Sequence, residues 1–482
     1  MTHTDNDRHQ IMSVYIGLGV LLLVSMAFRL YQLGSGLWFD EIMTLKDYAR
    51  LPYLEIITRF ESENQHFLYS LLAHSTILLF GESAWSLRLP AVLFGVGSIW
   101  AVYMLGAEVT DRKQAFLASA LLAFSYHHLW FSQNARGYTG LLFWTLVSSW
   151  LLLRTLRKPN RRDWILYAVA SALGVYTHLT MGFVIAGQFM VCVLVIVARY
   201  RRKEPVLLVD PAAGFALAGI LILFLHIPVF GQMQSVIGGS EVSVVTEWKN
   251  PMWTLSQFLQ GLRVSSSTGL AGFIFLLVAL FGLVSYWRSR PEFVGLLVLP
   301  PIFGAVVTVG IGHHLWPRFF FFTFGFAVLV VIRGVFTAAN WISRKINSPK
   351  LHGDFLGSVL SVSLIILSAF SMLSAYGPKQ DFGEALEFLE GEAASDDRIV
   401  VVSLTSLPYR DYYQKDWTEI TSAGELEGIT SQTGRTWLVY TFPEVLGSIY
   451  PDVMSMIQQD FSLVKKFPGT VQSGTIYVVL HE

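Results

Sequence analysis

The chain has 482 residues, of which 53% are hydrophobic and 14% are charged, whereas a soluble globular protein carries about 25% charged residues. Its 34 lysines and arginines balance its 34 aspartates and glutamates, so the net charge gives no indication of a nucleic-acid partner. So few charges cannot cover a water-exposed surface of this size, which excludes most soluble folds and predicts a polytopic membrane protein. The lone cysteine, Cys192, excludes an intrachain disulfide.

The first apolar run, residues 11–27, follows Arg8 and predicts a membrane-spanning helix. It is longer than the core of a signal peptide, about 7–15 residues, and no small residues of a cleavage site follow it. At about 1.5 Å per residue it is long enough to span a bilayer. We therefore expect a retained first helix.

Ten further apolar runs predict additional spans, so we expect about eleven transmembrane helices. These runs lie at residues 89–107, 115–131, 138–153, 164–180, 182–198, 212–230, 267–286, 293–311, 319–335 and 355–376. One more run, 66–80, is ambiguous from hydropathy alone, and the charges of the connections decide how it is interpreted.

Lysines and arginines cluster in five connections, each separated from the next by two spans, so all five lie on one side of the membrane. The clusters lie at residues 112–113, 154–162, 199–203, 288–290 and 333–350. The positive-inside rule assigns that side to the cytoplasm. If 66–80 is a surface-lying or partly re-entrant helix, the amino terminus with Arg8 is cytoplasmic as well. The loops 34–87 and 231–266 and the carboxyl-terminal tail then face outward.

The tail, residues 377–482, has the composition of a soluble domain and follows a transmembrane domain of residues 1–376. Helix and strand patterns alternate along the tail, which predicts a small α/β domain. The expected helices lie at 382–389 and 444–458, and the expected strands at 398–404, 437–441 and 475–480.

Two adjacent carboxylates, Asp40 and Glu41, follow Trp38-Phe39 just after the first span. Such a pair beside a membrane exit can supply a general base or oxygen ligands for a hard cation. The structural alternative is a solvated helix start, with Asp40 as the cap and Glu41 in the first turn.

Two arginines lie on the outer face, where the positive-inside rule gives no reason for them. Arg136 belongs to the motif Gln133-Asn134-Ala135-Arg136-Gly137-Tyr138, and Arg318 ends His313-His314-Leu315-Trp316-Pro317-Arg318. A guanidinium pairs with two phosphate oxygens, so both positions suit an anionic head group. The alternative is structural arginines that snorkel to lipid phosphates.

Three histidines accompany these motifs. His178 ends the outer motif Tyr176-Thr177-His178 and can serve either a substrate or a helix cap, whereas His313 and His314 raise the question of a metal. Adjacent histidines usually point apart, so a metal is the minor alternative and the metal content is left open. Together the constellations predict an outward-facing pocket that holds a base and two phosphate-binding arginines.

At these motifs the sequence resembles the C-type glycosyltransferase superfamily with its GT-C fold, in particular the protein O-mannosyltransferase and aminoarabinose transferase-like branch. The resemblance rests on the order and spacing of motifs through most of the membrane region, at residues 38–41, 66–80, 81–90, 127–138, 176–178 and 317–322, and on the start of the tail at 378–399. The family usually has prolines after the position of His66, where this chain has Phe67 and Leu68.

The resemblance implies a membrane glycosyltransferase that takes a sugar from a polyprenyl-phosphate donor and passes it, with inversion, to an acceptor outside the membrane barrier. The implied roles are Asp40 as general base with Glu41 beside it, Arg136, Arg318 and Tyr138 at the donor phosphate, and Gln133, His66, His178, His313 and His314 at the substrates. The implied location is a bacterial inner membrane, and a divalent metal is the one cofactor left open.

The acceptor can be a lipid, a glycan or a protein. Two other classes fit part of the pattern. A transporter or flippase for a lipid-linked saccharide would also need outer arginines, but it predicts inverted repeats. A noncatalytic assembly subunit would use the Trp38–Glu41 motif only as a helix start.

Overall fold

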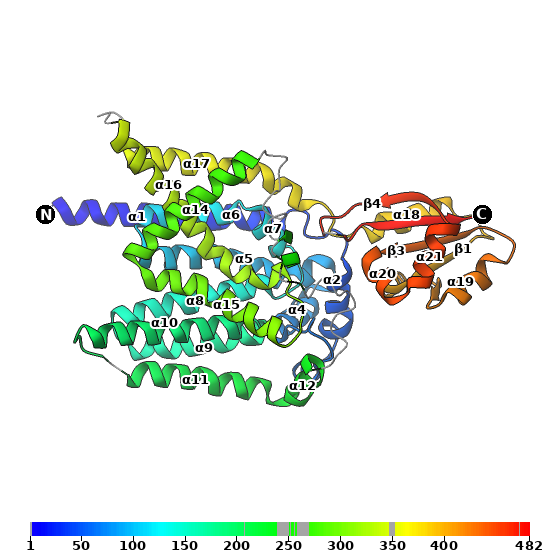
Figure 1. Cartoon of the computed structure of the whole chain (residues 1–482), viewed down its shortest axis with the longest axis horizontal. Helices are drawn as coiled ribbons and strands as arrows, with labels where there is room; N and C mark the ends of the chain where they lie inside the picture. The colour runs from blue at the N-terminus through cyan, green and yellow to red at the C-terminus, as the bar shows by residue number, and fades with distance from the viewer. Residues whose placement is uncertain are drawn as a thin grey trace.

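The computed structural model of the chain describes residues 2–206, 208–238, 250, 252–254, 256–257, 269–346, 352–471 and 473–482. A bundle of long helices makes up most of it, and a small domain at the carboxyl terminus is attached to one end of the bundle (Figure 1). The amino terminus lies at the opposite end of the bundle. The expected acidic residues of the second outer loop, Glu241 and Glu247, lie outside the described residues.

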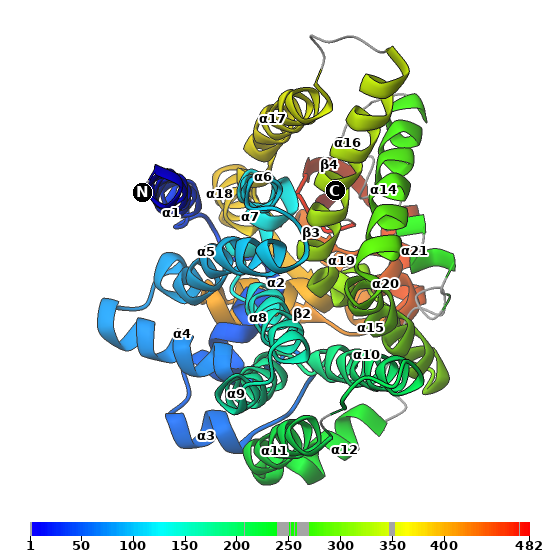
Figure 2. The same cartoon turned by 90° about the vertical axis from the view of Figure 1, so that its left-hand side faces the viewer.

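Most of the long helices of the bundle run in nearly the same direction, whereas α14 and α16 are tilted relative to them (Figures 1 and 2). They are α1 (Thr2–Leu30), α5 (Ala84–Val109), α6 (Arg112–Ala123), α8 (Tyr138–Arg157), α9 (Arg161–Thr177), α10 (Met181–Arg201), α11 (Val209–His226), α14 (Gly269–Ser289), α15 (Pro291–Gly310), α16 (Phe324–Ile346) and α17 (Gly353–Met372). Shorter elements connect them: α2 (Phe39–Thr44), η1 (Leu45–Ala49), α3 (Tyr53–Thr58), α4 (Phe67–Phe80), α7 (Tyr126–Ser132), η2 (Ile227–Val229), α12 (Phe230–Gly238), η5 (Pro317–Thr323) and η6 (Leu373–Tyr376).

Within the described part of the chain, nine helices are long and apolar enough to cross a membrane. The chain is thus an integral membrane protein, as its composition predicts. The two remaining expected spans form shorter helices. The run 115–131 is divided between α6 and α7, and 164–180 corresponds largely to α9, which has 17 residues. The count of about eleven therefore stays a prediction.

The ambiguous run 66–80 forms α4, a helix of 14 residues. When the bundle is viewed along its axis, α5, α8 and α9 are seen end-on, whereas α3 and α4 are seen from the side (Figure 2). A helix in this orientation does not cross the layer formed by the long helices. The interpretation of 66–80 as a surface-lying segment agrees with this arrangement.

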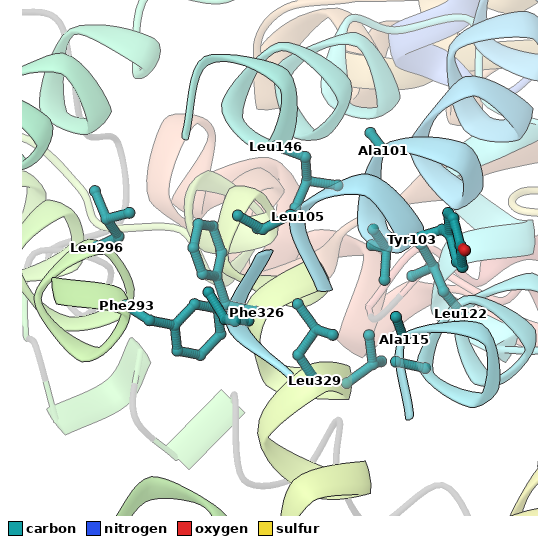
Figure 3. Close-up of a cluster of buried hydrophobic side chains, with 14 of the residues drawn as sticks. Ala101, Tyr103, Leu105, Ala115, Leu122, Leu146, Phe293, Leu296, Phe326 and Leu329 are labelled. Carbon is teal, nitrogen blue, oxygen red and sulfur yellow. The ribbon is translucent and has the colours of Figure 1, made fainter. Parts of the chain in front are cut away.

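The largest core lies inside the bundle and joins α5, α6, α8, α15 and α16. Leu105, Leu146, Phe293, Phe326 and Leu329 meet there, and all are buried (Figure 3). Small residues allow the closest helix approach: a Cβ on Gly282 of α14 would lie 2.0 Å from the Val330 carbonyl oxygen of α16. Such close backbone contact is characteristic of helix pairs in membranes. The backbones of α14 and α16 are therefore in direct contact at this point.

The carboxyl-terminal domain contains a five-stranded sheet in the order β2-β1-β3-β5-β4. Strands β1, β2 and β3 are parallel, and β5 runs antiparallel to β3 and β4. Its elements are α18 (Phe382–Glu392), β1 (Arg398–Val402), η7 (Ser403–Thr405), η8 (Leu407–Tyr412), β2 (Thr418–Ile420), α19 (Ala423–Thr430), β3 (Thr436–Thr441), α20 (Pro443–Ile449), α21 (Pro451–Asp460), β4 (Ser462–Phe467) and β5 (Ile476–His481).

This confirms the small domain with a sheet that the sequence predicts. The expected helix 444–458 is divided into α20 and α21, because Pro451 starts a new helix and Tyr450 before it is not helical. Strands β2 and β4 were not expected. Each is mostly exposed at an edge of the sheet and therefore lacks an apolar signal.

Candidate active site

The two carboxylates of the Trp38–Glu41 motif lie at the start of α2, between the bundle and the carboxyl-terminal domain (Figure 1). Trp38 is the N-cap, and its backbone N–H donates to Glu41 Oε2 at 3.3 Å. The Trp38 indole N–H donates to Asn134 Oδ1 at 3.1 Å, which ties the motif to the turn that carries Arg136. Asp40 is the second residue of the helix, so its side chain and that of Glu41 point in different directions.

Asp40 lies between the two arginines that the sequence singles out. Its Oδ2 atom is 3.3 Å from Arg318 Nη1 and 3.4 Å from Arg136 Nη1. The first contact is a hydrogen bond and the second an ion pair. The Asp40 side chain is 17% exposed and that of Arg136 only 5%. Segments almost 280 residues apart in the chain therefore converge on a single carboxylate oxygen.

The arginines retain unused hydrogen-bond donors. Within the described part of the chain, Arg136 Nε and Nη1 and Arg318 Nε are buried without a hydrogen-bond partner. Buried donors in proteins are almost always paired. Three guanidinium nitrogens at one site are therefore left without the hydrogen-bond partner that buried donors usually have.

Glu41 is completely buried and makes a bidentate ion pair with Arg88 of α5, with distances of 2.7 and 2.5 Å. The Ala135 N–H donates to the same carboxylate at 2.7 Å. Burial alone would raise the pKa of Glu41, but the charges of Arg88 and Lys379 and the hydrogen bonds lower it. Glu41 thus stays ionised and holds α2 against α5 and the 134–136 turn. In this position it supports the site and does not face the arginines around Asp40.

His66, Tyr138 and His178 form an aromatic group next to Arg136. The ring centroids of His66 and His178 are 4.6 Å apart, and that of Tyr138 is 5.9 Å from His66 and 5.1 Å from His178. Burial, followed by the charge of Arg136, lowers the pKa of both histidines, to about 3 for His178. Both rings are therefore neutral and add no charge to the site. The Tyr138 ring lies 5.7 Å from the Arg136 guanidinium carbon, which fixes the arginine from one side.

A second carboxylate, Glu63, lies on the far side of Arg318. Its Oε1 is 3.5 Å from His313 Nδ1, and burial raises the pKa of Glu63 although His313 and Arg318 oppose that shift. His314 packs near Phe319 and Trp316, with ring centroids 6.3 and 5.5 Å away. The two histidines are therefore near the site but face different neighbours. Among the described residues, no group of three or more histidines, cysteines or acidic residues can hold a metal ion.

Gln133, also expected at the substrate, has a different environment. Its side-chain N–H groups donate to the carbonyl oxygens of Arg29 at 3.0 Å and Tyr31 at 2.6 Å. The backbone carbonyl oxygen of Gln133 accepts from Lys379 Nζ at 2.6 Å. Its amide connects the end of α1 to the turn before Arg136, so a direct substrate contact stays untested.

Sequence reasoning assigned no role to Arg88, Lys379 or Gln380. Arg88 is a cation inside an apolar helix, a costly placement that could have indicated a buried partner. Gln380 accepts from the Phe39 backbone N–H at 3.2 Å, next to Asp40, and is 1% exposed. The local sequence around Lys379 and Gln380 does not predict that the first residues of the carboxyl-terminal domain contact the start of α2, which carries Asp40 and Glu41.

A pocket of about 280 Å³ lies where this domain meets α2. Phe39, the neighbour of Asp40, lines it together with residues of η7, η8 and β2 such as Ser403, Arg410 and Glu419. The pocket provides space next to the loop that carries Asp40.

Two solved structures are similar to almost the whole chain. The Archaeoglobus fulgidus oligosaccharyltransferase in complex with Zn and sulfate matches with a TM-score of 0.51 and 11% identity over 94% of this chain and 72% of that one. ArnT from Cupriavidus metallidurans in the apo state matches with a TM-score of 0.49 and 11% identity over 98% of both chains. At 11% identity, the match to the oligosaccharyltransferase shows a shared fold.

The sequence comparisons cover a smaller region. Residues 65–230 match the family model of dolichyl-phosphate-mannose-protein mannosyltransferases. The protein YkcB of Bacillus subtilis (strain 168), whose name assigns it provisionally to the mannosyltransferases, is 26% identical over 171 residues. That match covers 35% of this chain and 24% of YkcB, so the similarity spans about a quarter of the length of this relative.

Proposed function

We propose that this protein is a membrane glycosyltransferase. It moves a sugar from a polyprenyl-phosphate-linked donor to an acceptor at the end of the bundle that carries the carboxyl-terminal domain. The observation that carries the proposal is the convergence of Arg136 and Arg318 on Asp40, with guanidinium N–H groups buried and unused. This combination of a carboxylate and two cations suits a reaction that deprotonates a hydroxyl and expels a phosphate.

The chemistry assigns a role to each group. Breaking the bond between the anomeric carbon and a phosphate oxygen leaves negative charge on the phosphate, and preplaced guanidiniums stabilise that charge most strongly where water is scarce. Asp40 takes the proton of the attacking acceptor as general base. Attack from the side opposite the leaving phosphate inverts the anomeric centre. Tyr138, His66 and His178 enclose the donor head group on the side of Arg136.

The donor class is supported by the match of residues 65–230 to a family that is described by its dolichyl-phosphate-mannose donor. A lipid anchor keeps the donor in the bilayer while its head group meets the acceptor at the surface, which supplies proximity. The sugar and the acceptor class, whether lipid, glycan or protein, are open.

The charge pattern of the connections supports an orientation with the amino terminus in the cytoplasm and the active site outside it. In a bacterium this corresponds to the outer face of the inner membrane. Polyprenyl-phosphate sugars and acceptors of the cell envelope are then both accessible.

The arginine clamp, defined as Arg136 and Arg318, is tested by truncation. Losing one partner of a buried charge pair costs about 2–5 kcal/mol, so Arg136→Ala and Arg318→Ala should each reduce donor affinity or turnover by more than about tenfold. Arg136→Lys should recover only part of the donor affinity or turnover that Arg136→Ala loses, because an ammonium cannot form the bidentate fork. Arg112→Ala, at the first residue of α6 and in one of the basic connections, is the matched control.

Binding of a polyprenyl-phosphate sugar and sugar transfer are measured for all four variants in the same membrane background. Equal and mild effects in all four would mean that the outer arginines only anchor helices, and the proposed site would be misplaced.

A further inference from the structure

Both arginines of the clamp contact one oxygen of one carboxylate. Arg136 Nη1 and Arg318 Nη1 lie 3.4 and 3.3 Å from Asp40 Oδ2. Among the described residues, Asp40 is the carboxylate within ion-pair distance of either arginine, since Glu41 pairs with Arg88 and Glu63 with His313. Two positive charges therefore face one negative charge, and guanidinium N–H groups remain unpaired. At ion-pair distance, the clamp thus has one positive charge that no carboxylate balances.

Several titratable and aromatic groups surround the clamp and bear on its charge balance. His66 and His178 lie on the side of Arg136 and are neutral, because burial lowers the pKa of both rings. Tyr138 lies against Arg136, and Trp316 lies 5.0 Å from the Arg318 guanidinium carbon. Glu63 and His313 form their own pair beyond Arg318. The charge of Glu63 also acts on Arg318, but Glu63 is within ion-pair distance of His313 and of neither arginine. At ion-pair distance, the clamp therefore holds two positive charges and one negative charge.

From this geometry, and resting on the proposed function, we propose that Asp40 and the donor phosphate share the arginine clamp. We further propose that the proton Asp40 accepts during transfer compensates the negative charge that the phosphate gains. Asp40 is then more than a base beside the phosphate, since it is the second anion of the same binding site.

The charges balance at each stage. A donor phosphodiester carries one negative charge, and with ionised Asp40 it gives two negative charges facing two arginines. During transfer the bond from the anomeric carbon to the phosphate oxygen breaks and its electron pair stays on that oxygen. The acceptor oxygen bonds to the anomeric carbon, and its proton moves to Asp40. The product phosphate then carries two negative charges and Asp40 none, so the total is unchanged.

A constant total charge has an energetic advantage. Where water is scarce, interactions between charges are several times stronger than in water, and a site whose net charge changed during the reaction would have to reorganise its surroundings. The clamp needs no such reorganisation. After the product leaves, Asp40 returns its proton to water and again occupies the clamp alone, which is the arrangement observed here.

This arrangement predicts that binding of a phosphate monoester is coupled to the uptake of a proton by Asp40. A site made of the arginines alone would bind the phosphate without this uptake. A phosphate monoester is largely a dianion at pH 8, because its second pKa is about 6. When it binds to the clamp, Asp40 must take up a proton to keep two negative charges. Removing the Asp40 charge should abolish this uptake and also remove a competitor for the arginines.

The experiment is calorimetric binding of undecaprenyl phosphate to the purified full-length protein at pH 8, in two buffers of different ionisation enthalpy. We expect uptake of about one proton by the wild type and none by Asp40→Asn, which should bind the phosphate about tenfold more tightly. Asp47→Asn, in the same outer segment but outside the clamp, should behave like the wild type. Glu63→Gln should retain the uptake.

Equal proton uptake in wild type and Asp40→Asn, weaker binding by Asp40→Asn, or loss of uptake only in Glu63→Gln would overturn the shared clamp. Sugar transfer by the same preparations separates the two proposals. Transfer without proton linkage refutes the shared clamp and leaves the proposed function standing, whereas linkage without transfer supports the shared clamp and refutes the glycosyltransferase.

Discussion

Asp40 and Glu41 are neighbours in sequence with different environments. Asp40 faces the arginine clamp, whereas Glu41 is fully buried against Arg88. The sequence predicts that both matter and that Arg136 and Arg318 belong with Asp40, because charges at an outer membrane boundary need partners. The choice of Asp40 over Glu41 as the base comes from the family resemblance, and the residues alone do not predict that Glu41 is the buried one. That depends on the helix start at Trp38 and on Arg88, which comes from another helix.

The structural role of Glu41 predicts a large stability effect for its partner. Arg88→Met would leave a buried carboxylate without its counter-charge, which costs about 3–5 kcal/mol. Arg50 and Glu82 form an ion pair with 41% exposed side chains, and Arg50→Ala should cost at most about 1 kcal/mol. Denaturant unfolding in detergent measures both. Similar losses for the two variants would contradict the assignment of Glu41 as the buried support of α2.

At the scale of elements, the site depends on a contact between two parts of the chain that the sequence treats as separate domains. The segment 378–381 is hydrogen-bonded on one side to the start of α2, where the Gln380 side chain accepts from the Phe39 backbone N–H. On the other side, the backbone N–H groups of Thr470 and Val471 donate to the carbonyl oxygens of Pro378 and Lys379. Composition indicates where the soluble part begins, since hydropathy falls there. It contains no information on this docking, because long-range contacts leave no periodic pattern.

Lys379 makes this docking dependent on pH. Burial lowers the pKa of Lys379 to about 7, with a smaller contribution from Arg88 and an opposing one from Glu41. The pKa of an unfolded lysine is about 10.4, so between about pH 7 and 10 the unfolded state binds a proton that the folded state lacks. The free energy of unfolding therefore rises with pH across this window.

Lys379→Met fills a similar volume and removes this titration. The thermal stability of the wild type relative to Lys379→Met should increase between pH 7 and pH 9. The exposed Lys415→Met should leave the pH dependence of the wild type unchanged. A difference between wild type and Lys379→Met that stays flat or falls with pH would contradict a neutral buried lysine at this contact.

At the scale of the whole molecule, hydropathy predicts the long helices well, because membrane spans are uniformly apolar. Hydropathy does not predict where a helix ends inside an apolar run or which polar side chains are buried there. The run 115–131 is continuous in hydropathy, but the helix is interrupted between α6 and α7. His128 and Ser132 of α7 are hydrogen-bonded to the buried Arg29. The crosswise α4 was recognised from the charges of distant connections and not from its own sequence (Figure 2).

The arrangement predicts that the two ends of the bundle face different compartments. Reporter fusions at about residue 160 and at residue 482 should give a cytoplasmic signal at the first position and an external signal at the second, because basic residues concentrate at the first end. An external signal at residue 160 together with a cytoplasmic signal at residue 482 would invert the topology and place the arginine clamp in the cytoplasm.

The central claim is that the clamp and Asp40 together transfer a sugar from a lipid phosphate. The most direct measurement is sugar transfer by the purified protein from a panel of polyprenyl-phosphate sugars to membrane acceptors, with wild type and Asp40→Asn side by side. We predict transfer by the wild type from at least one donor, and a turnover about 10²–10⁴-fold lower for Asp40→Asn with undecaprenyl phosphate still bound. Near-normal turnover by Asp40→Asn, or flipping of the intact donor by the wild type without transfer, would contradict the account.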